Sequence, residues 1–295
     1  MNTNLPSPCS LNVGLQEVRE LREADRERVL SLLAQDPVRS VILRGLILDY
    51  GMCAPELRGV FYGYFTGEQL TDLALIGHQL IVFANDEALP ALAQKAVDLQ
   101  ARLHMILGPE HQVEKLWGYL AQHERETRRM SAQRLYVCQE AGSAPERRQL
   151  LRANYAELDV VTDAQAEMAL EASGVDPRQN DLAGFRHRIV ERLERKRIWV
   201  KIEDGKVVFK ADIFSDTPDT VYLEGIWTHP NYRNRGIAKS CMAELLSRLL
   251  CDHQTICLFT DETEQAAQSV YEHVGFNFVA NYQARFLAPL APAGT

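Results

Sequence analysis

The chain has 295 residues, a formal net charge of −8 and an isoelectric point near 5.6, and this acidic balance argues against a general affinity for nucleic acid or anionic membranes. Hydrophobic residues make up 46% of the chain, enough to build the core of one large domain or two ordinary ones. No apolar run approaches the roughly 20 residues of a membrane span, and the first residues do not resemble a secretory signal. We therefore expect a cytoplasmic protein with neither nucleic acid nor a membrane as partner.

In the first half, hydrophobic periodicity predicts two helices, three meandering strands, and then helix, strand, helix and strand. The basic run at 125–134 is interpreted as the solvated end of the last helix. The helices are expected at 21–35, 38–50, 88–103 and 109–121, and the strands at 59–65, 70–76, 80–84, 104–107 and 135–139.

The second half has the same order of elements, with a hairpin around Asp204 and Gly205, a pair that favours a tight turn. The helices are expected at 158–172, 181–195, 237–250 and 264–273, and the strands at 198–202, 207–214, 222–228, 255–260 and 276–286.

This repetition predicts an α+β (mixed α/β) fold in which helices flank a central twisted sheet in each of two tandem domains. The domains are expected at 15–140 and 149–288, joined by a linker at 141–148, with tails at 1–14 and 289–295. The alternative is an unrelated α+β domain in the first half.

The stretch 221–250 carries the clearest functional signal. A strand runs into the basic turn Arg233-Asn234-Arg235-Gly236, and a helix with apolar residues at helical spacing follows. The first amides of a helix have no partner inside it and lie at the positive end of its dipole. Gly236 lets the backbone approach a ligand closely, and the two arginines add charge. The turn is therefore predicted to be an anion cradle suited to a pyrophosphate.

Two ordered motifs resemble the GNAT superfamily of N-acetyltransferases. Arg-x-x-Gly-x-Ala at 233–238, after Ile-Trp-Thr-His-Pro-x-Tyr, is similar to the acetyl-CoA-binding core of that family. Farther along, Ala267, Tyr271 and the Gly-Phe pair at 275–276 are similar to its late helix. The two-part layout also resembles bacterial GNAT proteins that have an uncharacterised N-terminal domain.

The resemblance implies acetyl-CoA (coenzyme A) as acyl donor and assigns residues to it. In the family the central strand splays from its neighbour, lends backbone groups to the pantetheine arm, and carries a bulge that Gly225 is expected to mark. Glu264 stands where the family often has an asparagine that contacts the pantetheine region. The implied cofactor-binding residues are Ile226, Trp227, Thr228, Arg233, Asn234, Arg235, Gly236, Ile237, Ala238, Lys239 and Glu264.

Tyr271 is the candidate general acid, and the alternative is an aromatic core residue beside Phe276. Glu224 is the candidate base, because a carboxylate in a central strand is costly unless it is used or paired. Its alternative is a structural ion pair with a basic residue of a neighbouring strand. A further alternative is that a chain of water molecules, and not a single base, removes the proton from the amine. Asp261 and Glu262 are candidates for attracting the substrate ammonium, or else caps of the next helix.

The first half lacks the cradle motif. Where it would stand, the chain has Asn85-Asp86-Glu87, and two carboxylates at a helix start would repel a phosphate. We therefore expect the first domain to have lost cofactor binding and to supply a substrate wall or an interface.

The six cysteines show no paired metal spacing and the eight histidines no HExxH cluster, so no metal is expected. The predicted function is acetyl-CoA-dependent N-acetylation. The primary amine of an unidentified acceptor attacks the thioester directly, and the reaction passes through a tetrahedral intermediate. A homodimer paired at sheet edges is a possible assembly. The alternatives are a catalytically silent acyl-CoA-binding regulator or scaffold, a tandem transferase of a longer acyl or aminoacyl group, and a small-molecule acetyltransferase of a thiol pathway whose first domain forms part of the substrate pocket.

Overall fold

A computed structural model describes residues 16–123, 126–142 and 149–288. The predicted tails and most of the predicted linker fall outside these ranges, so the domain boundaries stay predictions. In the described part of the chain every helix is too short or too polar to cross a bilayer. No group of three or more potential metal-ligating side chains occurs within the same ranges.

The mixed α/β fold class is confirmed. The first half contains β1 (Gln16–Glu20), α1 (Arg26–Leu33), α2 (Val41–Tyr50), β2 (Gly59–Thr66), β3 (Gln69–Gly77), β4 (Gln79–Phe83), α3 (Leu89–Asp98), β5 (Met105–Pro109), α4 (Glu110–Leu120) and β6 (Thr127–Cys138). The second half contains β7 (Leu151–Arg152), α5 (Leu158–Ser173), α6 (Pro177–Glu194), β8 (Ile198–Glu203), β9 (Lys206–Asp216), β10 (Thr220–Thr228), α7 (Ile237–Leu249), β11 (Thr255–Asp261), α8 (Gln265–His273) and β12 (Asn277–Leu287).

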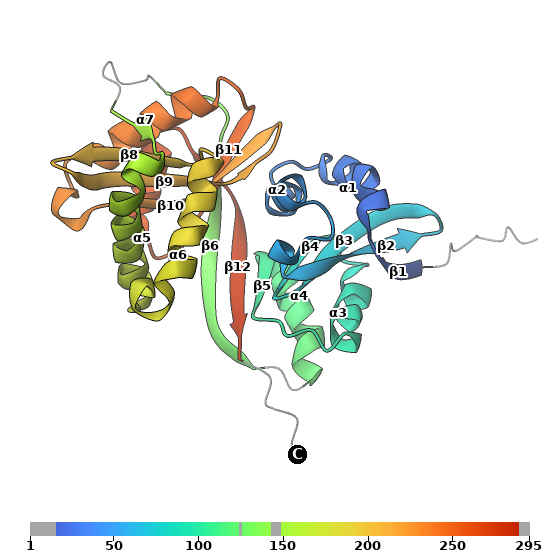
Figure 1. The fold of residues 1–295 in the computed structure, drawn as a ribbon. Coiled ribbons are helices and arrows are strands. Elements are labelled where there is room, and N and C mark those ends of the chain that lie inside the picture. The colour runs from blue at the N-terminus through green and yellow to red at the C-terminus, as the bar shows by residue number, and fades with distance from the viewer. Residues whose placement is uncertain (1–15, 124–125, 143–148, 289–295) are drawn as a thin grey trace, which may run out of the picture.

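The twelve strands of the described residues join in one mixed sheet of order β1-β2-β3-β4-β5-β12-β6-β11-β10-β9-β8-β7. Only the β4–β5 and β10–β11 pairs are parallel. Each half therefore gives its last strand to the other: β12 pairs with β5, and β6 pairs with β11. The two exchanged strands run side by side through the centre of the molecule (Figure 1).

The basic run was predicted wrongly as a helix end, because residues 127–138 form β6. Residues Thr127 to Val137 pair with β12, and Gln133 to Cys138 pair with β11. Pairing with a strand on each side stabilises the strand conformation, although the charged segment has only a weak intrinsic preference for it. Tertiary context outweighs β propensity in this way.

Helices cover both faces of the sheet. In the second half, α7 and α8 pack on one face, where Met242, Leu245 and Leu246 are fully buried. Helices α5 and α6 cover the opposite face through side chains such as Phe185 and Ile189. In the first half, α3 and α4 share a core that is separate from the core under α1 and α2.

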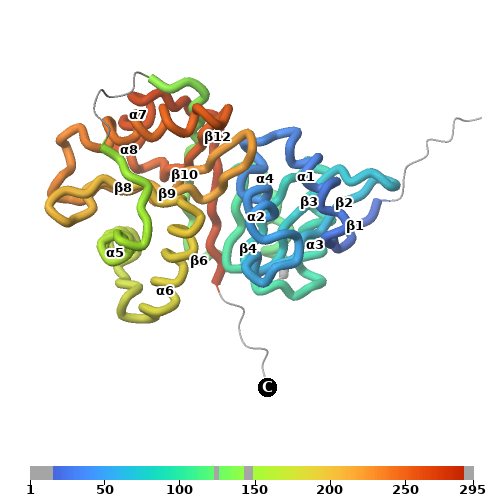
Figure 2. Tube along the Cα trace, turned by 45° about the horizontal axis from the view of Figure 1, so that its top comes forward, coloured from blue at the N-terminus to red at the C-terminus, as the bar shows by residue number. Residues whose placement is uncertain are grey.

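Helix α2 belongs to the first half but also rests on β9 and β10 of the second (Figure 2). Its Asp49 accepts two hydrogen bonds from Arg197, with nitrogen–oxygen distances of 2.5 and 2.7 Å. Its Arg44 is ion-paired with Asp219. The shared sheet and these charge-assisted contacts join the two halves into one body.

Candidate active site

A cleft opens where β10 leaves β11. The two strands pair only as far as Leu223 and Leu258, although β10 continues to Thr228 and β11 to Asp261. A cavity of about 460 Å³ occupies this opening, a volume that is usual for a small-molecule site. It is lined by Ile226, Trp227, Thr228, Tyr232, Arg233, Asn234, Gly236, Ile237, Ala238, Lys239, Ala266, Ala267, Ser269, Val270 and Tyr271. Most of the predicted cofactor-binding residues therefore lie around one cavity.

The expected bulge at Gly225 is confirmed. The register with β9 shifts between Glu224 and Trp227, and Gly225 has a φ of +56°, which favours glycine. As a result Ile226 packs against the core under α7, whereas Trp227 packs against the core of α5 and α6. The bulge leaves backbone groups of β10 facing the cleft without a regular ladder partner.

The turn before α7 forms an open cradle. Asn234 and Gly236 both have positive φ, of 60° and 75°. A Cβ added to Gly236 would have no atom within 4 Å, so the space in front of this backbone is free. Helix α7 begins at Ile237 without a side-chain cap, and its first amides have no partner within the helix. These donors, at the positive end of the helix dipole, fit an anionic group.

Glu171 of α5 contacts two residues of the cavity lining, Trp227 and Arg233. Arg233 forms an ion pair with it, with nitrogen–oxygen distances of 2.7 Å, and also donates from Nε to the carbonyl oxygen of Thr228 at 3.0 Å. The indole of Trp227 donates to the same carboxylate at 3.1 Å. The hydrogen bond from Arg233 lowers the pKa of Glu171, so this carboxylate is ionised near neutral pH. Sequence reasoning missed Glu171, because nothing in its helical surroundings marks it.

Two predicted cofactor contacts lie outside the cavity lining. The guanidinium of Arg235 stacks over the ring of Tyr232, 5.2 Å from its centroid. Glu264 precedes the first residue of α8, and its side chain makes no capping hydrogen bond. Contacts from Arg235 and Glu264 to a bound cofactor therefore stay predictions.

Tyr271 lies on α8 and lines the cleft, with 7% of its surface exposed. Its ring packs near Tyr136 and Phe276, with centroids 6.3 and 5.9 Å away, so the packing role considered from sequence is present. Its hydroxyl makes no hydrogen bond to any residue that the structure describes. Burial, reinforced by the charge of Glu264, raises the pKa of the Tyr271 phenol, so the hydroxyl keeps its proton at neutral pH.

Glu224 belongs to a buried cluster of charged groups on the opposite face of the sheet from α7. Arg192 of α6 donates to Glu224 at 2.8 Å and to Asp212 at 2.9 Å. Lys210, which is fully buried, lies 2.6 Å from Asp212. The two positive and two negative groups offset one another in charge, which explains how this strand region tolerates them, although Oδ1 of Asp212 has no hydrogen-bond partner among the described residues. The partner of Glu224 is thus on a helix, not on the neighbouring strand that the sequence analysis considered.

The surroundings of Glu224 also set its acidity. Its side chain is 29% exposed. Burial raises the pKa of the carboxyl and the attraction of Arg192 offsets part of that rise, while repulsion from Asp212 adds to it. A carboxylate with a raised pKa is a better general base, so the ion pair and a role in proton transfer are compatible. One signal for this cluster was present in the sequence: Lys210 and Asp212 interrupt the otherwise apolar run from Val207 to Phe214 in β9.

Asp261 has a local role. Its carboxylate accepts hydrogen bonds from Ser131 at 2.9 Å and from the amide and hydroxyl of Thr263 at 3.0 and 2.7 Å. These contacts organise the turn before α8.

Two family models match parts of the chain. Residues 161–276 match the acetyltransferase (GNAT) family, and residues 59–161 match a domain of unknown function (DUF4081). No curated protein has a sequence that matches this chain significantly.

Solved structures resemble nearly the whole chain. A GNAT-family acetyltransferase from Colwellia psychrerythraea is 15% identical, with 92% of this chain and 99% of that chain covered and a TM-score of 0.55. A tandem GNAT protein from the clavulanic acid biosynthesis pathway is 12% identical, with coverage of 95% and 100% and a TM-score of 0.59. A Drosophila protein is also 12% identical, with coverage of 91% and 98% and a TM-score of 0.60. At these identities the likeness shows the fold alone. That fold is the tandem GNAT architecture, which confirms both the repeat predicted from the order of elements and the GNAT fold implied by the resemblance.

Proposed function

Because residues 161–276 form a domain of the acetyltransferase (GNAT) family, we propose that this protein is an acetyl-CoA-dependent N-acetyltransferase acting on a primary amine. The family match and the fold support an acyltransferase in general. The finer proposal is carried by one observation: an open helix N-terminus with a free cradle at Gly236 lies beside the point where β10 and β11 separate.

The residues around the cleft fit the parts of an acyl-CoA. The amides that begin α7, together with Lys239 and Arg233, suit the diphosphate. The cleft then passes between the bulged end of β10 and α8, whose Ala266, Ala267 and Val270 present an apolar wall to the pantetheine arm.

Bound acetyl-CoA would supply an activated thioester for attack by the amine. In the proposed reaction Glu224 accepts, directly or through water, the proton that the amine loses as its nitrogen–carbon bond forms. Tyr271 donates a proton to the sulfur as the carbon–sulfur bond breaks, so the products are an amide and a free thiol. Solvent then returns the proton from Glu224 to Tyr271. Holding both reactants in this geometry is the main contribution of the fold.

The test combines binding with turnover. Calorimetric titration should show one acetyl-CoA bound per chain, and release of free thiol should depend on added amine. Tyr271→Phe removes the proposed acid and keeps the packing of the ring, so we expect kcat to fall by about a hundredfold with acetyl-CoA affinity unchanged. Absence of acetyl-CoA binding would overturn the proposal.

Binding without turnover over a broad panel of amines would instead support the alternative, an acyl-CoA-binding regulator or scaffold. We further propose a reducing, cytoplasmic setting. All five cysteines in the described residues are free, which fits that compartment.

A further inference from the structure

The face of the sheet that carries Glu224 holds a row of four aromatic rings. Phe214, Tyr222, Phe259 and Tyr282 come from β9, β10, β11 and β12 in turn. Neighbouring rings are close, with centroids 5.4, 5.3 and 4.8 Å apart along the row. The row therefore crosses the centre of the sheet and ends on the strand that pairs with β5 of the first half.

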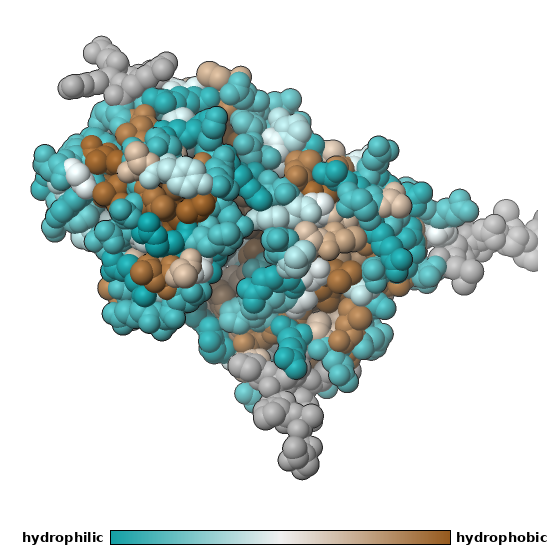
Figure 3. Space-filling model, in the orientation of Figure 1, coloured by the Kyte–Doolittle hydropathy of each residue, from teal (hydrophilic) through white to brown (hydrophobic). Residues whose placement is uncertain are grey.

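The middle of this row lies at the opening between β10 and β11. The last pair of that ladder is Leu223 with Leu258, so Glu224 and Phe259 stand on the two sides of the opening, directly after it. Tyr222 lies two residues before Glu224, on the same face of the strand. This face of the molecule is hollowed between the halves (Figure 3), and Tyr222, Glu224 and Phe259 remain partly exposed. An amine that approaches the opening from this face therefore passes next to aromatic rings.

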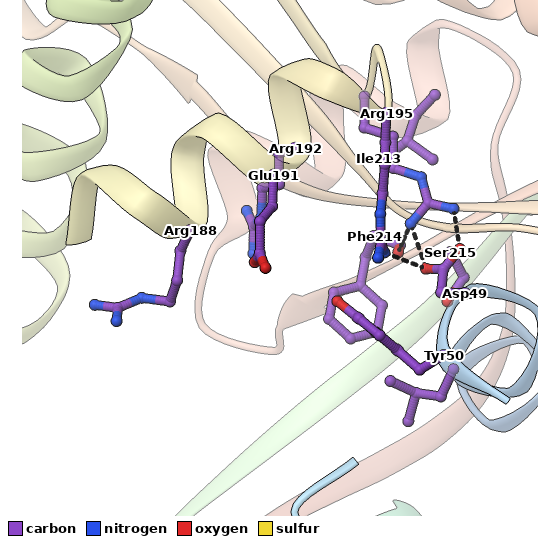
Figure 4. A pocket seen from close by; sticks show the side chains of 11 residues that line it. Asp49, Tyr50, Arg188, Glu191, Arg192, Arg195, Ile213, Phe214 and Ser215 are labelled. Atoms are coloured by element: carbon purple, nitrogen blue, oxygen red, sulfur yellow. Dashed lines mark hydrogen bonds and ion pairs between the residues drawn. The ribbon is translucent and has the colours of Figure 1, made fainter. Parts of the chain in front are cut away.

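The space beside the row toward α6 is small, and its charges are paired. Phe214 lines a cavity of about 160 Å³ between α6 and α2, where dashed lines mark the ion pairs of Asp49 (Figure 4). Asp49 binds Arg197 at 2.5 Å, and Arg192 of the same lining binds Glu224 at 2.8 Å. Ligand pockets usually have volumes of roughly 300 Å³ or more, so the body of a substrate does not fit there.

The other end of the row opens into a larger hollow, of about 1060 Å³, that Tyr282 lines. Part of its lining is apolar and comes from β6 and β12, for example Leu135 and Ala280. These two residues pack in one hydrophobic cluster with Tyr282 and Phe259. The hollow therefore continues the apolar surface that begins beside the opening, and both halves of the chain build it.

Tyr282 supplies an independent observation. It is 7% exposed and lines the hollow, and its hydroxyl makes no hydrogen bond to any residue that the structure describes. Burial raises the pKa of this phenol, so the hydroxyl keeps its proton and remains a hydrogen-bond donor. Buried hydroxyl groups nearly always have a partner, and a polar group of a ligand held in the hollow would provide one.

The polar part of the hollow is mainly acidic. Among the described residues, its lining has the carboxylates of Asp36, Asp86 and Glu87 and one guanidinium, that of Arg39. Arg39 already donates to two oxygen atoms of the same lining, and Asp86 is offset by Lys115. Glu87 makes no hydrogen bond or ion pair to the residues that the structure describes. The hollow therefore keeps a negative balance, which attracts an ammonium ion.

We propose that this surface binds the acceptor, and that the acceptor is an amine carried on an aromatic or otherwise flat apolar body. The amine reaches Glu224 at the opening, and its body lies along Tyr222 and Phe259. A polar group at the far end of the body meets the hydroxyl of Tyr282. Since the proposed cofactor cleft lies on the face of α7 and α8, the two substrates meet in the opening from opposite sides of the sheet. This inference rests on the proposed acetyl transfer.

The first test compares amines of matched length. Tyramine, 2-phenylethylamine, 2-cyclohexylethylamine and ethylamine share a primary amine on an ethyl group and differ in the body attached to it. We expect 2-phenylethylamine to exceed ethylamine about a hundredfold in kcat/KM, because its ring is buried, and to exceed 2-cyclohexylethylamine about threefold, because its ring is flat. Tyramine should exceed 2-phenylethylamine about threefold. Equal turnover of ethylamine and the aromatic amines would overturn the inference while leaving acetyl transfer intact.

Two variants locate the effect through ratios that a general loss of activity does not change. Phe259→Leu should reduce the advantage of 2-phenylethylamine over ethylamine about tenfold. Tyr282→Phe should remove the advantage of tyramine over 2-phenylethylamine. Phe278→Leu is the matched control, because Phe278 is an exposed ring of β12 that contacts Tyr136 in the core under α7. Unchanged ratios in Phe259→Leu, or the same change in Phe278→Leu, would contradict the assignment.

A binding measurement separates this inference from the proposed function. Tyramine is titrated calorimetrically into the full chain, alone and with coenzyme A present. Binding that is weakened in Phe259→Leu and kept in Phe278→Leu supports the site even if no amine is acetylated. Absence of tyramine binding under both conditions, or binding that Phe259→Leu leaves unchanged, would overturn the site whatever the titration with acetyl-CoA shows.

Discussion

The two halves of the molecule share one topology but differ at the turn that is proposed to bind the cofactor in the second half. In the second half, β10 has nine residues and a bulge at Gly225, and it leads into an uncapped helix at Gly236. In the first half, the equivalent strand β4 has five residues and no bulge in its pairing with β3, and it leads into α3. The fold alone therefore does not make an anion site.

The turn after β4 is already satisfied by its own neighbours. The amide of Asn85 donates to the carboxylate of Asp72 at 2.6 Å, and Asp86 is ion-paired with Lys115. A hollow of about 1060 Å³ lies there too, but Asp86 and Glu87 contribute negative charge to its lining. Whether the turn suits or repels a phosphate therefore depends on a few residues at the end of one strand. It does not depend on the sheet, which both halves share.

The largest expected effect comes from separating the halves. In a fragment of residues 149–295, β12 would lose both of its neighbours, and β11 would lose β6, leaving unpaired strand edges. We expect the fragment to lack a cooperative thermal transition by circular dichroism, whereas the full chain unfolds in one step. Adding a fragment of residues 1–142 should restore the transition. A fragment that folds and binds acetyl-CoA alone would show that the strand exchange is dispensable.

The next effect tests the cradle itself. Gly236→Glu makes this turn resemble the first half, because it adds a carboxylate at the helix start and a side chain at positive φ. We expect acetyl-CoA to bind about a hundredfold more weakly by calorimetry. Gly67→Glu is the matched control, since Gly67 has a similar φ of +63° and equally open space but lies in the turn after β2. If both variants bind acetyl-CoA alike, the cradle assignment is wrong.

A smaller effect concerns the proposed base, which β4 lacks altogether because its five residues include no carboxylate. Burial raises the pKa of Glu224, so the ionised fraction grows as the pH rises through that raised value. Wild-type kcat/KM should therefore increase with pH on the acidic side. Glu224→Gln should abolish that limb and lower kcat/KM by about tenfold at neutral pH.

The control for this pH profile is Glu203→Gln, which alters an exposed ion pair on β8. It should keep the wild-type curve. If the acidic limb of the kcat/KM profile is unchanged in Glu224→Gln, another group is responsible for that titration. Glu224 would then have only a structural role, as the ion-pair partner of Arg192.

The smallest expected effect is at Glu171, which forms an ion pair with Arg233. In the first half, Lys115 forms the corresponding ion pair with Asp86. Glu171→Gln frees the guanidinium for the diphosphate. Because this ion pair is exposed, we expect acetyl-CoA affinity to rise only about threefold by calorimetry. Asp159→Asn on the same helix should have no effect. Weaker binding in Glu171→Gln would mean that Glu171 holds Arg233 in its binding position.

The sequence by itself determined the local features of this protein. The cradle at 233–239, the bulge at Gly225 and the order of the elements depend on residues close together in the chain, so spacing and turn chemistry reveal them. The same local reasoning failed at 127–134, where a charged segment becomes a strand because two distant strands flank it.

Only the tertiary structure decided which distant groups meet. The exchange of β6 and β12, the contact of Glu171 with Arg233 and the pairing of Arg192 with Glu224 join residues that no periodicity connects. The cavity between α2 and α6 likewise exists only because the two halves close into one sheet. Such contacts depend on long-range packing and register, which are set by the sum of many weak interactions across the whole fold and leave no signature in any single stretch of sequence.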